Sequence, residues 1–292
     1  LLVGLQPMLL ATGTIVNIDI ALIFGTTLFF WSALRLIEKP SPLNHLLTLI
    51  SLSIAFLGKA PGIAFVPVVI AIYLYLLQGK YQFSFKKIVY FGFYFGALLL
   101  ILFLSFAPDT LLTTFLNLGG NSKFVSPLQS ILTYLDKTLG VDALLRTHAS
   151  YWGNFGWLDT KINDTLLTFL WILEVLAWFG AILFLLSKKT LSYLPNKRVV
   201  ILSISLLLFL QLAIRFYDWR IFDTVGKIVI GAPGRYFLPT IVPYFLLLVT
   251  GFGFLFTKNR AQFTLLLKTL SLGMLLLSMY AVFNVIIPRY YL

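Results

Sequence analysis

The sequence RTHASYWGNFGWLDT, residues 146–160, is an aromatic stretch within the longest polar interruption of an otherwise apolar chain. Two tryptophans, Trp152 and Trp157, alternate with glycines, and Asp159 follows them. Glycines between large rings let the backbone turn tightly while the rings pack on it or on a ligand. A plain connector between membrane helices would be rich in Ser, Gly and Lys and would lack this pattern. The stretch therefore predicts part of a functional site, and the apolar runs around it form the frame.

The composition places the chain in a lipid bilayer. Hydrophobic residues make up 60% of the 292 residues and charged residues only 11%, whereas soluble domains carry about 25% charged residues. The formal charge of +12 does not indicate nucleic-acid binding, because the basic residues fall in short loops between apolar runs. Cysteine is absent and only two histidines are present, which excludes a His-rich metal site. Carboxylates could still hold Mg²⁺ or Mn²⁺.

Eight apolar runs approach or reach the length of about 20 residues that a membrane-spanning helix needs. They cover residues 16–36, 43–57, 60–77, 88–106, 166–186, 199–216, 236–256 and 263–287. The second and third runs are short, and a charged turn with the sequence GKAPG joins them at residues 58–62. We therefore predict an all-α membrane protein, a single polytopic domain over residues 1–292 with about eight transmembrane helices.

The charges predict the orientation of these helices. The short loops at residues 35–42, 79–87, 187–198 and 257–262 hold eleven Lys and Arg and one acid. By the positive-inside rule these loops are cytoplasmic. The polar sections 107–165 and 217–235 are then external, and the first contains an amphipathic helix around Leu128–Leu139. We expect a multi-pass protein of the plasma membrane.

The start of the chain suggests a fragment. The first residue is Leu1, and no charged region or cleavage site precedes the apolar sequence. An N-terminus on the outer side also suggests a lost upstream span. We therefore expect the natural N-terminus to be missing.

Three polar residues near the first runs are candidates for a site. Asn17 and Asp19 lie at the outer mouth of the first run. Either they cap the free N–H groups of that helix, or the carboxylate meets a water-filled cavity as a base, a metal ligand or a partner of a sugar hydroxyl. Lys59 lies between two short helices, and it either extends to the lipid headgroups or binds a phosphate.

Two further groups of residues could recognise a ligand. Arg235 follows Gly234 and precedes Tyr236, and a guanidinium suits bidentate phosphate binding. An outer arginine that binds lipid headgroups is the alternative. Trp152 and Trp157 with Asp159 suit a sugar platform, since aromatic faces stack on the C–H groups of pyranoses. Interfacial tryptophans without such a role are the alternative.

Glu174 lies inside the fifth run, where a carboxylate is a functional candidate by default. Its simplest partner is Arg215, near the outer end of the sixth run. A structural ion pair between the two is the more economical interpretation.

Three pieces of the sequence together resemble a known family. They are QP at residues 6–7 with TIVNID at 14–19, YWGNFGWLD at 151–159 and GRYFLP at 234–239. These pieces resemble the DUF2142 family of predicted bacterial membrane proteins. That family is similar to the GT-C superfamily of polytopic glycosyltransferases. The resemblance covers most of the chain; each piece alone is a weak signal, and their combination is fairly specific.

The resemblance implies transfer of a sugar from a polyprenyl-phosphate donor to a glycan or lipid acceptor of the cell envelope, on the outer face. In that superfamily an acidic residue of the first external loop acts as base or metal ligand. This loop is absent here, so the expected carboxylate lies upstream of Leu1, and Asp19 is a candidate without being its match. The donor phosphate would be held by Arg235 and Lys59. Membrane lipids are further expected partners, and nucleic acid is not.

Two other functions remain as alternatives. A transporter or flippase for lipid-linked sugars or polysaccharides would show matched, broken halves, and none is visible in the sequence. A polymerase or ligase of the O-antigen type also uses external arginines and lipid-linked sugars. Its product would be a chain of repeats instead of one added residue.

Overall fold

The described residues form helices, most of them apolar, and one short two-stranded sheet. The computed structural model describes residues 2–13, 18–78, 126–155, 160–188, 191–228 and 233–290. The elements are α1 (Pro7–Gly13), α2 (Ile18–Glu38), α3 (Pro42–Gly58), η1 (Ala60–Phe65), α4 (Val66–Gln78), α7 (Pro127–Leu139), α8 (Val141–Trp152), β1 (Asn154–Phe155), β2 (Thr160–Lys161), α9 (Asp164–Leu186), α10 (Lys197–Val225), η2 (Gly234–Thr240), α11 (Ile241–Phe256), α12 (Arg260–Ala281), η3 (Val282–Ile286) and α13 (Ile287–Tyr290).

The prediction of an all-α membrane protein is confirmed. Within the described residues, five helical segments are long and apolar enough to cross a membrane: Asp19–Glu38, Asp164–Leu186, Lys197–Val225, Gly234–Phe256 and Arg260–Arg289. The predicted runs 43–57 and 60–77 form the shorter apolar helices Pro42–Gly58 and Pro61–Leu76. The predicted run 88–106 lies outside the described residues, so the count of eight stays a prediction.

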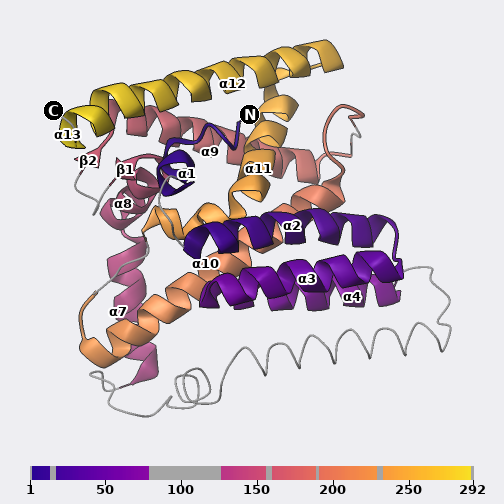
Figure 1. Ribbon diagram of the computed structural model, residues 1–292, viewed down its shortest axis with the longest axis horizontal. Helices are drawn as coiled ribbons and strands as arrows, with labels where there is room; N and C mark the ends of the chain where they lie inside the picture. Colours follow the sequence, from indigo (N-terminus) through magenta and orange to yellow (C-terminus); the bar gives the residue numbers. More distant parts are fainter. Residues whose placement is uncertain are drawn as a thin grey trace. The chain divides into compact units, whose positions relative to one another are not determined.

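The chain divides into two compact units. Unit 1 consists of Leu1–Asn17, Lys137–Leu208 and Ala232–Leu292, and unit 2 of Ile18–Asp136 and Phe209–Gly231. In unit 2, α2 and α3 lie side by side (Figure 1). Their backbones approach closely at Gly25, where an added Cβ would lie 2.6 Å from the Cα of Ala55. Small residues at a helix contact permit this approach in membrane proteins.

Unit 1 is built on the packing of α9 against α11. An added Cβ at Gly251 would overlap the carbonyl oxygen of Ala177, and one at Gly180 would overlap the carbonyl oxygen of Gly251. The opposite side of α9 carries exposed apolar side chains such as Ile182, which is 50% exposed. A helix that is apolar on all sides suits a lipid environment. The unit therefore packs through small residues and turns large apolar side chains outward.

The polar sections contain more helix than the sequence suggested. The amphipathic helix expected around Leu128–Leu139 is confirmed as α7. In the section 217–235, α10 continues past Phe216 to Val225, so its first part is helical and not a loop. Buried polar contacts support this extension in unit 2, because the Tyr134 hydroxyl donates to Asp218 Oδ2 at 2.8 Å. Residues 107–125 lie outside the described part of the chain.

Candidate functional site

Parts of the three sequence pieces that carry the family resemblance meet at the C-terminal end of α8: Gln6 of the first, Tyr151 of the second and Gly234 of the third. The buried side chain of Gln6 donates from Nε2 to the Tyr151 carbonyl oxygen at 2.6 Å. Its Oε1 accepts from the backbone N–H of Leu9 at 2.5 Å and so caps α1. In Figure 1, α1 lies beside α8 and beneath α12, and it contacts both helices. The first piece is thereby fixed to the second.

The third piece docks on the same end of α8. The backbone N–H of Gly234 donates to the Ser150 hydroxyl at 2.5 Å. A Cβ at position 234 would overlap the carbonyl oxygen of Thr147 and the backbone nitrogen of Tyr151. Only glycine therefore lets η2 approach α8 this closely. This contact places Arg235 and Tyr236 next to α8, with the Arg235 guanidinium carbon 5.6 Å from the centre of the Tyr236 ring.

A part-buried carboxylate lies where α8, α9 and α11 meet. Glu174 is ten residues beyond the first residue of α9, about 15 Å along the helix. Its Oε1 accepts from Trp152 Nε1 at 2.5 Å and from the Tyr244 hydroxyl. Its Oε2 lies 2.8 Å from His148 Nδ1. Three donors from two other helices therefore satisfy this carboxylate within the membrane-spanning part of unit 1.

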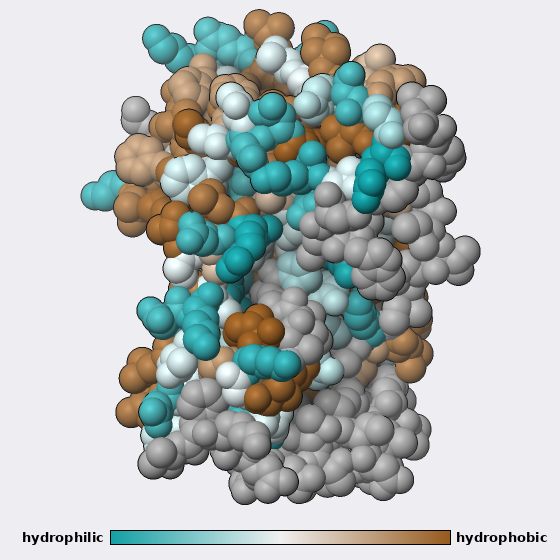
Figure 2. Space-filling model, turned by 90° about the vertical axis from the view of Figure 1, so that its left-hand side faces the viewer, coloured by the Kyte–Doolittle hydropathy of each residue, from teal (hydrophilic) through white to brown (hydrophobic). Residues whose placement is uncertain are grey.

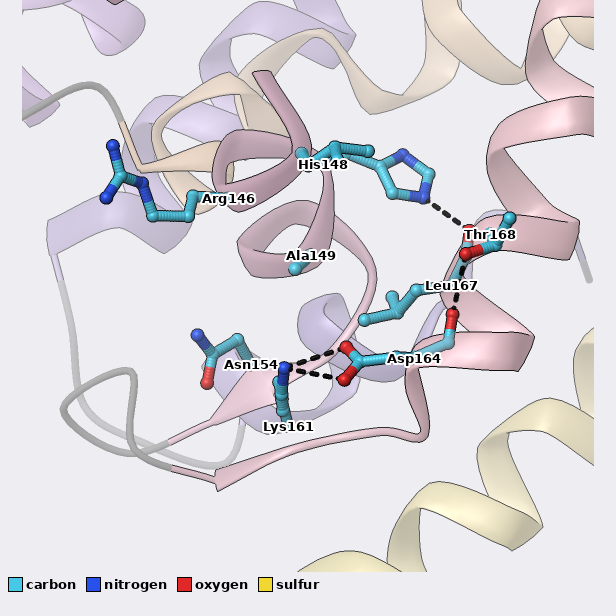
Figure 3. Close-up of a pocket in the computed structure, with 9 residues that line it drawn as sticks. Arg146, His148, Ala149, Asn154, Lys161, Asp164, Leu167 and Thr168 are labelled. Atoms are coloured by element: carbon cyan, nitrogen blue, oxygen red, sulfur yellow. Dashed lines mark hydrogen bonds and ion pairs between the residues drawn. The ribbon is translucent and has the colours of Figure 1, made fainter. Parts of the chain in front are cut away.

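The bonds of His148 define where its protons lie. Its Nε2 is 2.9 Å from the carbonyl oxygen of Leu167 (Figure 3). A carbonyl oxygen only accepts, so Nε2 carries a hydrogen. The contact between Nδ1 and Glu174 Oε2 then holds one proton, either on the imidazolium or on the carboxylic acid. In both forms the pair as a whole is neutral.

The Tyr151 hydroxyl beside this pair is buried and has no hydrogen-bond partner. Its ring packs edge-on against Trp152 and Tyr244, with centroids 5.8 Å and 5.0 Å away. Burial raises the pKa of this hydroxyl well above its usual value, and the nearby charge of Glu174 raises it further. Tyr151 is therefore a neutral phenol whose hydrogen-bond donor is free.

A polar cleft adjoins His148. It has a volume of about 530 Å³ and lies between α8, β1, β2 and the first turns of α9. Its lining residues are Leu145, Arg146, His148, Ala149, Asn154, Lys161, Asp164, Leu167 and Thr168. In Figure 3 the His148 ring reaches toward α9 while Arg146 points away from it. Figure 2 shows the face that lies on the left in Figure 1, and hydrophilic residues are interspersed with hydrophobic ones on it.

The polar groups of the cleft differ in what they already bind. Lys161 Nζ pairs with Asp164 Oδ1 at 2.7 Å. Arg146 is exposed and has no polar partner among the described residues. The buried Oδ1 of Asn154 also has none. Arg146 thus lies at the exposed edge of the cleft, and Asn154 Oδ1 is a buried acceptor without a partner, which is unusual in a folded protein.

The structure joins two of the predicted site residues in unit 2. Lys59 Nζ lies 2.5 Å from Asp19 Oδ1, and their side chains are 29% and 16% exposed. Lys59 also ends α3, because its backbone N–H donates to the Ala55 carbonyl oxygen. Asn17, predicted beside Asp19, lies outside the described residues. The pair shows that the charged turn and the start of α2 come together.

The predicted aromatic platform is not an exposed surface at Trp152. This side chain is 3% exposed, donates to Glu174 and packs 6.0 Å from the Phe245 ring. The sequence could not show that the C-terminal end of α8 is buried. Trp157 and Asp159 lie outside the described residues, so their proposed contacts with a sugar stay predictions.

The structure gives Glu174 partners that the sequence did not suggest, and its expected pair with Arg215 stays a prediction. The Nε of Arg215 donates to Gln211 on its own helix at 3.4 Å, whereas His148, Trp152 and Tyr244 satisfy Glu174. The sequence analysis missed the role of Tyr244, because nothing in a membrane-spanning run marks one tyrosine as facing a distant carboxylate. Gln6 was part of a recognised piece, but its spacing gave no sign of the contact with Tyr151.

The expectation of Mg²⁺ or Mn²⁺ remains a prediction. Among the described residues, no group of three or more His, Asp or Glu side chains is placed to hold a metal ion. Asp19 faces Lys59 and Asp164 faces Lys161, so each of these carboxylates already binds a cation.

Comparison with known proteins gives one match. No curated protein and no solved structure matches this chain. The sequence model of DUF2142, described as a predicted membrane protein, matches residues 1–244. This region includes Gln6, Tyr151 and Gly234, the residues through which the three pieces meet. The chain belongs to the DUF2142 family of predicted membrane proteins.

Proposed function

We propose that this protein is a membrane glycosyltransferase that moves a sugar from a polyprenyl-phosphate-linked donor to an acceptor of the cell envelope. The observation that carries the proposal is the polar cleft at the end of α9, a helix apolar enough to cross the membrane. A lipid-linked sugar has its chain in the bilayer and its phosphate and sugar at the boundary. A cleft at the end of a spanning helix meets this need, and the family resemblance to the GT-C superfamily points to the same donor.

The groups in the cleft suit a sugar phosphate. Arg146 lines the exposed edge of the cleft, and its guanidinium can turn inward to bind a phosphate through two parallel hydrogen bonds. Asp164 and Thr168 offer oxygens to sugar hydroxyls. A volume of about 530 Å³ lies within the range of 300–1,000 Å³ typical of small-molecule sites. Arg235, on the other piece docked to α8, is a second cation for the phosphate or for lipid headgroups.

The chemical step needs a base that removes the proton of the acceptor hydroxyl. The acceptor oxygen then attacks the anomeric carbon, and the lipid phosphate leaves with the bonding electron pair. Asp19, which pairs with Lys59, remains the candidate base that the sequence suggests. We place the reaction on the extracytoplasmic side of the plasma membrane, where the charge of the short loops predicts the polar sections.

The test uses the purified chain in lipid nanodiscs with a radiolabelled, polyprenyl-phosphate-linked sugar. We expect label in an envelope acceptor, and Arg146→Ala should lower the rate at least about tenfold, because a charge-assisted bidentate contact contributes about 1.5–3 kcal/mol. Lys268→Ala is the control, since this exposed lysine of α12 removes the same charge away from the cleft. Equal rates in both variants would contradict the role of the cleft.

A transporter of the same ligand is the second candidate. The ionisable His148–Glu174 pair favours it, because charged groups inside spanning helices commonly mark proton-coupled transport. Proteoliposomes loaded with lipid-linked sugar separate the two functions. Movement of intact donor between leaflets without cleavage would favour transport, and cleavage without movement would favour transfer.

A further inference from the structure

We propose that His148 and Glu174 form a buried proton-binding site that controls the width of the cleft. The pair bridges the two walls of the cleft, because His148 comes from α8 and Glu174 from α9. The side chains are only 8% and 13% exposed. The proposal depends on the proposed function only for the identity of the ligand, and the proton site itself requires none.

The hydrogen bond between His148 and Glu174 requires one proton, which the two side chains share. His148 Nε2 must keep its hydrogen, since it faces the Leu167 carbonyl oxygen at 2.9 Å. Glu174 Oε1 is already occupied by the N–H of Trp152 and the hydroxyl of Tyr244. The remaining contact, Nδ1 to Oε2 at 2.8 Å, therefore has one hydrogen and one acceptor.

A change of one proton in either direction weakens the attachment of His148 to α9. If the pair loses its proton, the neutral imidazole has a single N–H for two acceptors on α9, the Leu167 carbonyl oxygen and Glu174 Oε2, so one of the two contacts is lost. If the pair gains a proton, the imidazolium N–H faces a carboxylic acid, whose oxygens accept more weakly than those of a carboxylate. Both states therefore loosen α8 from α9 at His148.

No other basic residue is bonded to Glu174 within the described part of the chain. Tyr244 faces it from α11 and Tyr151 from α8. The charged groups nearest His148 on the cleft side are Arg146 and the Lys161–Asp164 pair. Of the other elements packed on α8, α1 has no charged residue and η2 has Arg235. The charge of Glu174 is thus balanced by the proton it shares with His148.

The position of the His148–Glu174 pair between α8 and α9 couples proton binding to ligand binding in the cleft. The residues that line the cleft from α8 include Arg146 and Ala149, and those from α9 include Asp164 and Thr168. Separation of the two helices at His148 changes the distance between these sets. A ligand that binds best at one width of the cleft then changes the affinity of the His148–Glu174 pair for a proton. By linkage, binding of the proton changes the affinity of the cleft for this ligand by the same factor.

The absence of cysteine allows a direct test without a ligand. A single Ala149→Cys substitution places a thiol in the cleft, and Gln129→Cys places one on the exposed side of α7 as a control for the reactivity of thiols. The ratio of the two labelling rates with a water-soluble maleimide is measured against pH in nanodiscs. Tryptophan fluorescence shows over which pH range the protein stays folded.

We expect this ratio to change about fivefold or more as the pH leaves the range in which the pair holds one proton. The change should disappear in the Glu174→Gln background and persist in Asp164→Asn, which removes a carboxylate of the same cleft. If Glu174→Gln does not fold, His148→Gln replaces it. A ratio that stays constant, or that changes equally in all backgrounds, overturns the proposal.

Polyprenyl phosphate in the nanodisc then separates this proposal from the proposed function. Protection of the thiol that varies with pH supports both. Labelling that depends on pH without protection supports the proton site and counts against the cleft as a donor site. Protection without any dependence on pH overturns the proton site alone.

Discussion

Trp152 Nε1 donates to Glu174 Oε1 across 2.5 Å and so joins the end of α8 to the interior of α9. We expect Trp152→Phe to lower the free energy of unfolding by about 1–3 kcal/mol, because a charged acceptor loses one of its donors. The measurement is thermal or denaturant unfolding in detergent micelles. Trp171→Phe is the matched control, since that ring is 45% exposed on α9. Equal losses in the two variants would show that the bond contributes nothing.

Two tyrosines that pack on each other should respond differently to the loss of a hydroxyl. Tyr244→Phe removes a donor to Glu174 and should destabilise the protein by about 1–3 kcal/mol. Tyr151→Phe removes a buried hydroxyl without a partner, so stability should stay the same or rise. The same unfolding measurement compares them. A large loss in Tyr151→Phe would mean that its hydroxyl binds a partner in the membrane-bound protein.

Gly234→Ala should detach η2 from α8. The added Cβ would overlap the Thr147 carbonyl oxygen, and backbone atoms cannot move aside as a flexible side chain can. We expect a loss of about 2 kcal/mol or more and faster proteolysis near Arg235. Gly273→Ala in α12 is the control, because no atom lies within 4 Å of its added Cβ. That change should stabilise the helix by about 1 kcal/mol.

Gln6→Ala should loosen α1 from α8. The substitution removes both the donor to the Tyr151 carbonyl oxygen and the acceptor of the Leu9 N–H, and leaves these groups buried. A cost of about 1–3 kcal/mol is expected, with faster hydrogen exchange in α1. Gln129→Ala on the exposed side of α7 should change stability by less than about 0.5 kcal/mol. Similar values for both variants would contradict the role of Gln6.

The coupling between Asp19 and Lys59 can be measured with a double-mutant cycle. Asp19→Asn, Lys59→Gln and the double variant isolate the interaction energy of the pair. Because both side chains are partly exposed, we expect about 1 kcal/mol at low salt and less at high salt. A coupling near zero at low salt would mean that the ion pair does not persist in the membrane.

The class of the protein and its spans could be read from the sequence because hydrophobicity is a local property. The same holds for α7, whose amphipathic pattern is confined to one segment. Glu174 could also be identified, since a carboxylate in an apolar run is unusual whatever surrounds it. Its partners could not, because His148 and Tyr244 reach it from separate helices. The pairing depends on how these helices pack.

The burial of Trp152 could not be predicted from the sequence either. An aromatic residue next to glycine suggested a surface for a sugar, but the end of α8 buries the rings of Tyr151 and Trp152. Only Gly234 in the third piece explains why this end is covered, and its contact with Ser150 spans 84 positions of the chain. Contacts of this range leave no periodic signal in a single sequence.

The attachment of α1 has a consequence for cleavage of the chain. Gln6 binds Tyr151, and the Leu5 carbonyl oxygen accepts from the Ser278 hydroxyl, so this segment contacts unit 1 as a bound peptide would. The peptide chain holds it there at a high effective concentration. A cut between α1 and α2 would turn an internal contact into an association that depends on dilution. After the cut, α1 would dissociate from the rest of unit 1 at low protein concentration. Addition of a synthetic peptide of residues 2–13 would restore the contact.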